Sequence, residues 1–249
     1  MLLHHCTWLE VEDRLKRSTG IIVPIGSTEQ HGPNGLIGTD ALCAEVVAQG
    51  VGETLDALVA PTIAVGMAQH HLGFPGSVTL RPSTLIAVVR DTVQSLARHG
   101  FDRIFFVNGH GGNIATVTAA FSEIYAERSL DSSGRNAPAV RCKLKNWFDG
   151  PAIGKLSKEL YGDAEGSHAT PSEVSLTQYA FPHSIKKARM SPDIAPSGLI
   201  YDSEDYRRRF ADGRIGSNPM LSTPEAGKRI YDTAVAEVAE TYRQFLGAA

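Results

Sequence analysis

Acidic and imidazole side chains occur in this sequence where a strand is predicted to turn into a helix. Glu29 and His31 stand two residues apart in GSTEQHGP, directly after a short apolar stretch. Residues two apart in extended backbone point to the same side, so a carboxylate and an imidazole would face one pocket. Both side chains are common ligands of divalent metal ions. The spacing therefore indicates metal chemistry.

Two further residues extend this candidate metal site. Asp40 begins a predicted helix, where the helix dipole tolerates an anion, and its carboxylate could bridge two ions. His110 lies in NGHGGN at the carboxyl end of a predicted strand, where ligands bind in open parallel sheets. Taken singly, Asp40 is explained as a helix cap and the others as solvated side chains. Their common place on one sheet edge favours a metal centre.

A third cluster is the segment EGSHATPSE from Glu165 to Glu173. His168 precedes a predicted helix and Glu173 falls in its first turn, so both side chains could lean toward the same pocket. Thr170 and Glu173 also have the spacing of a capping box, in which the glutamate binds the backbone N–H of the capping residue. The capping role and a metal role are compatible, and both stay open for Glu173.

Two other chemistries are less consistent with these motifs. NGHGGN joins a strand to a helix, as a dinucleotide-binding turn does, but it lacks the GxGxxG spacing. Ser27 does not stand in a GxSxG elbow, and no such nucleophile motif occurs elsewhere. We therefore expect neither an organic cofactor nor a serine nucleophile.

Alternating strands and helices must position these residues. Strands are predicted over 20–25, 58–65, 103–107 and 139–147. Helices are predicted from Asp40, from Pro82 to a stop at Gly100, over 114–128 and 172–180, and after a cap at Thr223. Pro24 indicates an edge strand or a bend where the ladder stops, and 183–221 reads as a long loop, a lid or a subunit contact. The alternation favours an α/β fold, a mostly parallel sheet with helices on both faces.

The composition is that of a globular protein. The 249 residues, 42% hydrophobic and 20% charged, predict one α/β domain over 1–249. A net charge of -3 without a basic stripe argues against a nucleic-acid partner. No apolar stretch reaches the roughly 20 residues of a membrane span, and the start lacks a signal-peptide pattern. We therefore expect a cytoplasmic protein without a membrane partner.

At the residues singled out above, the chain resembles the creatininase (creatinine amidohydrolase) family. The matching stretches are PIGSTEQHGPNGLIGTD (24–40), HLGFPGSVTL (71–80), FFVNGHGGN (105–113), SHATPSEVS (167–175) and GSNPMLSTPEAGKR (216–229). The first and third are specific signals. The resemblance implies a three-layer α/β/α domain with two divalent ions, zinc first and manganese or iron as alternatives. It also implies a homo-oligomer, a hexamer in many family members.

The same resemblance implies roles for the candidate residues. One ion would be bound by Glu29, Asp40 and His110, and the other by His31 and the same Asp40. His168 would be the catalytic proton shuttle.

The sequence departs from the creatinine-hydrolysing members at two positions. Those members complete the second site with a glutamate where this chain has Gly112, and we propose Glu173 as the replacement ligand. Their tryptophan four residues before the histidine that matches His168 is here Ala164, while Trp147 matches their other pocket tryptophan. These departures argue against creatinine as the substrate.

The expected reaction is hydrolysis of an amide-type C–N bond in a small cyclic amide, lactam or formamide by a metal-bridging water. One alternative is hydrolysis of a ring C–C bond in an oxidised cyclic polyol, because the same water activation would serve. A second alternative is a non-catalytic metal-binding scaffold that has lost the second ion. The expected partner is a small-molecule substrate.

Overall fold

The computed structural model describes residues 1–131 and 139–247, and within them a four-stranded parallel sheet forms the centre. Its strands are β1 (Gly20–Ile25), β2 (Leu58–Val59), β3 (Arg103–Asn108) and β4 (Arg141–Asn146), in the order β2-β1-β3-β4. All six residues of β1 are buried, as expected for a strand covered on both faces.

Helices pack around this sheet. The α-helices are α1 (Trp8–Leu15), α2 (Thr39–Leu55), α3 (Pro82–Arg98), α4 (Asn113–Leu130), α5 (Pro151–Tyr161), α6 (Pro171–Ala180), α7 (Ser203–Arg209) and α8 (Pro224–Gly247). Short 3-10 helices are η1 (Leu3–His5), η2 (Gln69–His71), η3 (Gly162–Ala164), η4 (Pro182–Ser184) and η5 (Pro219–Leu221).

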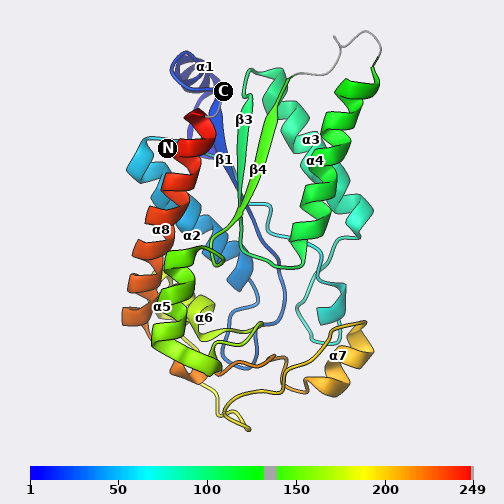
Figure 1. Cartoon of the computed structure of the whole chain (residues 1–249), viewed down its shortest axis with the longest axis vertical. Helices are drawn as coiled ribbons and strands as arrows, with labels where there is room; N and C mark the ends of the chain where they lie inside the picture. Colours follow the sequence, from blue (N-terminus) through cyan, green and yellow to red (C-terminus); the bar gives the residue numbers. More distant parts are fainter. Residues whose placement is uncertain (132–138, 248–249) are drawn as a thin grey trace.

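Two hydrophobic clusters separate the helices into two layers. On one face of the sheet, Ile22 and Phe105 pack with buried side chains of α2 and α8. On the other face, Ile21 and Phe106 pack with buried side chains of α3 and α4. Neighbouring residues of one strand thus join different clusters, as the pleat requires. Figure 1 shows α2 and α8 on one side of the sheet and α3 and α4 on the other, so the predicted α/β/α layering is confirmed.

The prediction that Pro24 marks an edge strand is wrong, because β1 lies between β2 and β3. The alternative prediction, a place where the ladder stops, is confirmed on one side. β2 pairs only with Ile21 and Ile22, so the missing N–H of Pro24 falls beyond the end of β2. The Pro24 carbonyl still accepts a hydrogen bond of 3.0 Å from the N–H of Ile63.

The predicted strand over 58–65 is much shorter in the structure. β2 ends at Val59, and only an isolated bridge between Ile25 and Ile63 continues its direction. Pro61 lies between the two pairings and has no N–H to donate, which breaks the ladder.

The predictions for the later segments are partly confirmed. The helix after Thr223 is α8, and the Thr223 hydroxyl accepts a hydrogen bond of 3.1 Å from the N–H of Ala226 as predicted. The segment 183–221, predicted as a loop, contains the helix α7, whose cap is Asp202. α1 and α5 were not predicted, although α5 has buried Ile153 and Leu156 at helical spacing.

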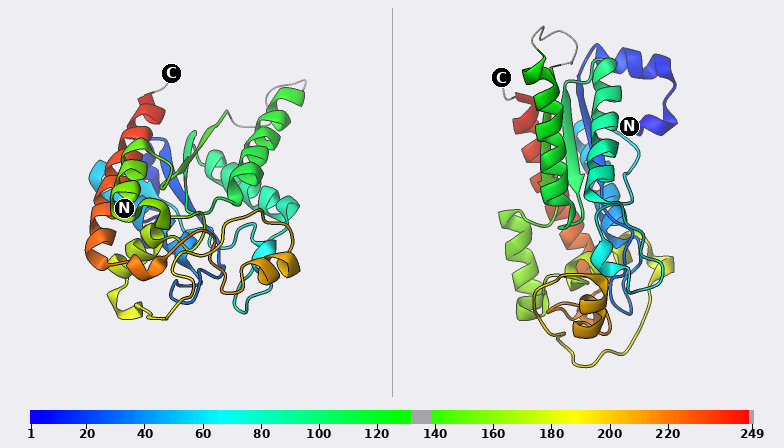
Figure 2. Two further views of the ribbon diagram at one scale, coloured as in Figure 1. Left: turned by 60° about the horizontal axis from the view of Figure 1, so that its bottom comes forward. Right: turned by 90° about the vertical axis from the view of Figure 1, so that its right-hand side faces the viewer.

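The loops that follow the carboxyl ends of the strands gather at one end of the molecule. In Figure 1 and in the right-hand view of Figure 2 they lie with α7 at the bottom, whereas both termini lie in the upper part. In parallel sheets this is the edge where ligands bind. Among the described residues, no helix combines the length and the apolar character needed to cross a membrane.

Candidate metal centre

The loop after β1 delivers Glu29 and His31 into the interior. The N–H of Glu29 donates to the Ile37 carbonyl at 2.7 Å, which closes the loop back on itself. His31 Nδ1 lies 3.0 Å from the Glu29 carbonyl, and a carbonyl only accepts, so Nδ1 bears the proton. His31 Nε2 therefore faces the centre. Both side chains are almost fully buried.

Asp40 lies in the first turn of α2, between two imidazoles. Its Oδ1 is 3.0 Å from His31 Nε2, and its Oδ2 is 3.0 Å from His110 Nδ1. The helix cap is Gly38, so the capping explanation for Asp40 is wrong. The helix N-terminus nevertheless stabilises this buried carboxylate. One carboxylate thus reaches both halves of the cluster.

The turn after β3 brings His110 against α2. Asn108 holds the turn, because its side chain donates to the His110 carbonyl at 2.7 Å and accepts from the His110 N–H at 3.2 Å. Gly109 is required there, since a Cβ atom would collide with the Asp40 carbonyl oxygen. His110 Nε2 lies 3.3 Å from Glu29 Oε2. The glycine therefore permits the close approach that joins the two loops.

Glu173 combines the two roles that its sequence context left open. The capping box is formed, with Thr170 N–H donating to Glu173 Oε1 at 2.5 Å. The other oxygen, Oε2, lies 3.8 Å from His31 Nε2.

A Cβ atom on Gly112 would collide with His110 Nε2 and come within 2.8 Å of the Met67 carbonyl. A side chain at position 112 would thus disturb His110.

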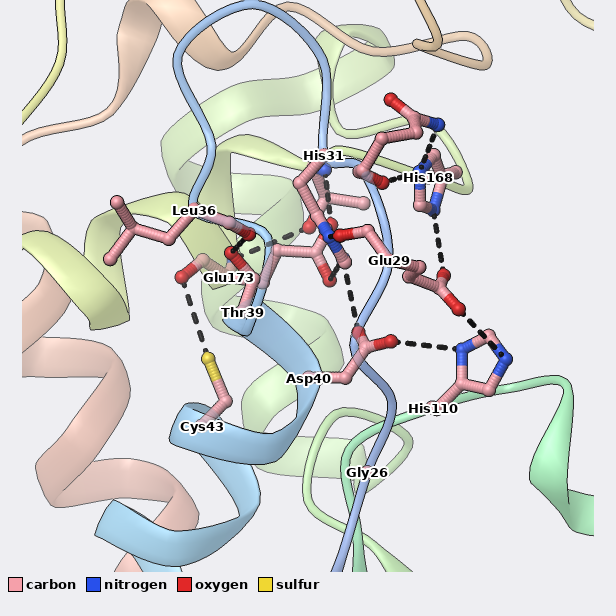
Figure 3. Close-up of polar contacts among 12 residues, drawn as sticks. Gly26, Glu29, His31, Leu36, Thr39, Asp40, Cys43, His110, His168 and Glu173 are labelled. Carbon is pink, nitrogen blue, oxygen red and sulfur yellow. Dashed lines mark hydrogen bonds and ion pairs between the residues drawn. The ribbon is translucent and has the colours of Figure 1, made fainter. Parts of the chain in front are cut away.

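His168 lies on the segment before α6, beside the same cluster. Its Nδ1 is 3.8 Å from Glu29 Oε1, and its ring centroid is 4.6 Å from that of His31. The next residue, Ala169, has a left-handed φ of 52°, a strained conformation for alanine. Figure 3 shows Glu29, His31, Asp40, His110, His168 and Glu173 converging from four segments of the chain. The structure brings all six predicted residues together.

These donors fit the requirements of a metal site. Three sets have ligand atoms within 4.8 Å of one another: Glu29, Asp40 and His110; His31, Asp40 and Glu173; and Glu29, His31 and His168. Within the described chain, both carboxylate oxygens of Glu29 and Oδ2 of Asp40 are buried with no partner in hydrogen-bonding geometry. Buried, unsatisfied carboxylate oxygens are costly, so they call for a cation. Carboxylate and imidazole suit zinc, manganese or iron.

The pKa shifts within the cluster also favour a bound cation. Burial opposes a charge on His31, yet Asp40 and Glu173 raise the pKa of His31 to about 10. Burial likewise opposes a charge on His110, but Glu29 and Asp40 raise the pKa of His110 to about 9. Burial itself raises the pKa of Glu29 above its usual range, and that of Glu173 to about 7. The carboxylates thus attract positive charge, as protons or as metal ions.

Three residues near this cluster were not identified from the sequence. His71 Nε2 lies 3.0 Å from Glu29 Oε1, and His70 packs beside His71. Gln30 contacts both rings, because its amide nitrogen lies 3.0 Å from His71 Nδ1 and its carbonyl oxygen lies 2.8 Å from His168 Nε2. Burial and neighbouring imidazoles lower the pKa of His71 to about 2 and the pKa of His168 well below its usual range, so both rings are neutral. The adjacent pair His70 and His71 in a loop-forming stretch was the available signal.

A cavity of about 820 Å³ opens from the cluster to the surface. Its wall includes Asp40, His110, His168 and Glu173, together with Trp147 and Lys158. Trp147 thus lines the cavity, as the sequence predicted for a pocket tryptophan, while Ala164 offers no aromatic surface. The volume is that of a pocket for a small molecule or a short peptide segment.

Known proteins resemble this chain over nearly its full length. The family model of creatininase, described as creatinine amidohydrolase, matches residues 4–242. The mycofactocin precursor peptide peptidase of Mycolicibacterium smegmatis is 31% identical over 90% of this chain and 85% of its own length. The creatinine amidohydrolase of Pseudomonas putida is 29% identical, over 96% and 94%. The 3-dehydro-scyllo-inosose hydrolase of Thermotoga maritima is 29% identical, over 78% and 60%.

Solved structures agree with this similarity. A manganese form of creatininase superposes with a TM-score of 0.83 and 25% identity, covering 99% of both chains. A zinc form superposes with a TM-score of 0.81 and 25% identity, covering 99% of this chain and 98% of that one. The relatives named here are hydrolases with different substrates.

Proposed function

The chain belongs to the creatininase family, and from this premise we propose that it is a binuclear metal-dependent hydrolase that cleaves an amide-type C–N bond. The observation that carries this proposal is the group of buried carboxylate oxygens of Glu29 and Asp40, which have imidazole nitrogens nearby but no partner in hydrogen-bonding geometry, beside an 820 Å³ cavity that Asp40 helps to line. Burying such oxygens without hydrogen bonds costs desolvation energy, which a bound cation would offset.

We assign one ion to Glu29, Asp40 and His110, and the second to His31, Asp40 and Glu173. The grouping of these donors within 4.8 Å supports this assignment. Asp40 would bridge the two ions, since each of its oxygens faces a different imidazole. The crowding at Gly112 supports Glu173 as the replacement ligand. We expect zinc first, with manganese or iron as alternatives.

Divalent ions in such sites lower the pKa of a water molecule and polarise the carbonyl group that it attacks. The residues of the chain then have separate tasks. His168 would take a proton from the attacking water and deliver it to the leaving nitrogen as the C–N bond breaks. The backbone N–H groups of Gly111 and Gly112, at the start of α4 and on the cavity wall, would stabilise the oxyanion.

The relatives and the size of the cavity support an amide as substrate. A peptide peptidase and a creatinine amidohydrolase both break amide-type C–N bonds. We propose a small cyclic amide, a lactam or a formamide, and not creatinine, because Ala164 and Gly112 depart from the creatinine-hydrolysing pattern. A homo-oligomer, hexameric by resemblance, a cytoplasmic location and a single domain over 1–249 stay predictions.

The similarity to an inosose hydrolase supports a second candidate, hydrolysis of a C–C bond in an oxidised cyclic polyol. The two candidates differ in their products. An amide substrate yields a new amine or ammonia, whereas the cyclic polyol yields a carboxylate and no nitrogen compound.

Metal analysis followed by a substrate screen tests the proposal. The wild-type protein should bind two ions per chain and form a new amine or ammonia from one amide class, the amine staying on the ring-opened product when the substrate is cyclic. Glu29→Gln and His110→Ala should each lose an ion and lower turnover by at least about a hundredfold, because each removes a ligand of the first ion. Unchanged metal content and turnover in both variants would refute the site assignment.

A further inference from the structure

Gln30 stands between the two metal-ligand candidates of the β1 loop, and its side-chain amide is buried beneath them. The amide oxygen accepts from the Gly32 N–H at 2.8 Å. The amide nitrogen lies 2.9 Å from the Gly213 carbonyl oxygen, which can only accept. Gly213 makes room for this amide, because a Cβ atom there would collide with it. The two contacts fix which end of the amide is the nitrogen.

The amide nitrogen has more neighbours than hydrogens. It carries two hydrogens, and the Gly213 carbonyl takes one of them. The other near neighbours are His71 Nδ1 at 3.0 Å, His168 Nε2 at 2.9 Å and the Tyr206 hydroxyl at 3.3 Å. The Tyr206 hydroxyl already donates to the Gly213 carbonyl at 2.8 Å. The Tyr206 oxygen can still accept, but at 3.3 Å it lies farther from the amide nitrogen than either imidazole, so the two imidazoles are the nearer competitors for the second hydrogen.

The backbone of Gln30 decides this competition. His168 Nε2 lies 2.8 Å from the Gln30 carbonyl oxygen, which can only accept, so Nε2 must bear a proton. A protonated Nε2 cannot accept the amide hydrogen. Nδ1 is then the only nitrogen of the His168 ring that can lack a proton, and this atom lies 3.8 Å from Glu29 Oε1 at the candidate metal centre.

The remaining amide hydrogen goes to His71 Nδ1. A neutral ring that accepts at Nδ1 bears its proton on Nε2, and His71 Nε2 lies 3.0 Å from Glu29 Oε1. His71 therefore presents its N–H to a carboxylate that would hold a metal ion, at 3.0 Å but outside the geometry of a hydrogen bond. Such an outer partner orients the ligand and tunes its affinity.

The geometry points to Gln30 as a positioning residue that sets the proton-bearing nitrogen of both His168 and His71. Through its backbone carbonyl it gives His168 a bare Nδ1 toward the centre, and through its side chain it directs the His71 Nε2–H to Glu29. The inference rests on the proposed function only for the use of His168 as a proton acceptor. The tautomers themselves follow from the hydrogen bonds.

Nuclear magnetic resonance of the zinc-loaded wild-type protein tests this directly. Long-range proton–nitrogen correlations on ¹⁵N-histidine-labelled protein report which ring nitrogen bears the proton. Both His71 and His168 are expected to be protonated at Nε2 and bare at Nδ1. A proton on Nδ1 of either ring would overturn the inference, and this measurement decides it even where a variant fails to fold.

Gln30→Glu distinguishes the role of the Gln30 side chain, which acts on His71, from that of its backbone carbonyl, which acts on His168. It keeps an oxygen for the Gly32 N–H but removes both amide hydrogens. His71 should gain a proton at Nδ1, whereas His168 should keep its tautomer because the backbone carbonyl is unchanged. Zinc affinity, measured by chelator competition, should fall by about 10–100-fold. An unchanged His71 tautomer together with unchanged zinc affinity would contradict the role of the amide.

Tyr206→Phe is the matched control. It removes a hydroxyl from the same hydrogen-bonded group but none of the contacts that assign the tautomers, so both tautomers and the zinc affinity should stay as in the wild type. A Tyr206→Phe protein with altered tautomers would mean that the whole group, and not Gln30, sets them. None of these measurements needs a substrate. Two bound zinc ions and the expected tautomers without amide hydrolysis would refute the proposed function and support this inference.

Discussion

The candidate centre has two halves, one for each ion, and Asp40 belongs to both. The halves differ in the hydrogen bonds that their other carboxylate ligands already make to the protein. In the half with Glu29 and His110, both Glu29 oxygens lack a hydrogen-bond partner among the described residues. In the half with His31 and Glu173, one Glu173 oxygen already accepts from the Thr170 N–H in a capping box. The Glu173 side chain is also 14% exposed, whereas that of Glu29 is fully buried. The second half should therefore bind its ion more weakly.

The largest effect is expected from a variant of Asp40, the ligand that both halves share. Asp40→Asn keeps the shape but removes the bridging charge, so we expect both ions to be lost. Turnover should fall by about three orders of magnitude, because the metal contribution is worth several kcal/mol. Metal analysis and kinetics measure both effects. Glu45→Gln is the matched control, since this acid also lies on α2 but contacts Thr62 and Gln49. Retention of two ions by Asp40→Asn would exclude the bridging role.

Removing Glu173 should affect one half only. In Glu173→Gln the metal content should fall from two ions to one, and turnover by about a hundredfold, since the ligands of the first ion stay intact. Metal titration with a chelator checks the stoichiometry.

Thr170→Ala separates capping from metal binding. It removes the hydroxyl of the capping box but keeps the backbone N–H that holds Glu173. The variant should lose about 1 kcal/mol of stability in denaturant unfolding and keep both ions. Loss of the second ion from Thr170→Ala, and not from Glu173→Gln, would reverse the assignment.

Metal affinity should depend on pH differently in the two halves. Despite burial, carboxylates raise the pKa of His31 to about 10 and the pKa of His110 to about 9 in the metal-free site. Each imidazole must lose its proton to bind a metal, so affinity should rise about tenfold per pH unit for each proton released. The rise ends above pH 9 for the first half and above pH 10 for the second. On acidification the second ion should leave first, and affinities measured by calorimetry from pH 6 upward check this order. Affinities independent of pH would contradict it.

Local sequence signals predicted the elements that hold the first half of the centre. β1, β3 and the turn at His110 follow from apolar runs that end in glycine-rich loops, and these signals need no knowledge of distant residues. The predicted length of β2 was too great because most residues from Leu58 to Val65 are apolar. The effect of Pro61 on the ladder depends on which strand lies beside it, and the local sequence does not show this. The apolar spacing of α5 is also a local signal, so this helix is predictable from the sequence.

The outer contacts of the centre could not be predicted in the same way. His71 and Gln30 lie 41 positions apart, and Gln30 and His168 are 138 positions apart. These pairs arise from how η2 and the segment before α6 pack on the β1 loop, which no local pattern encodes. Glu173 lies between the two cases: its capping role follows from the spacing to Thr170, but its second oxygen meets His31 only in the folded chain.

The convergence of the loops at the carboxyl edge has a consequence for the folding of the chain. The candidate ligands extend from Glu29 to Glu173, and a fragment that ends before α6 lacks the full set. Cations held there would act as a reversible cross-link between distant segments, adding about 4 kcal/mol to the native state when free metal exceeds the dissociation constant a thousandfold. The centre would thus make resistance to unfolding and proteolysis depend on metal supply. Such a chain gains its full stability in the same step in which it becomes competent for chemistry.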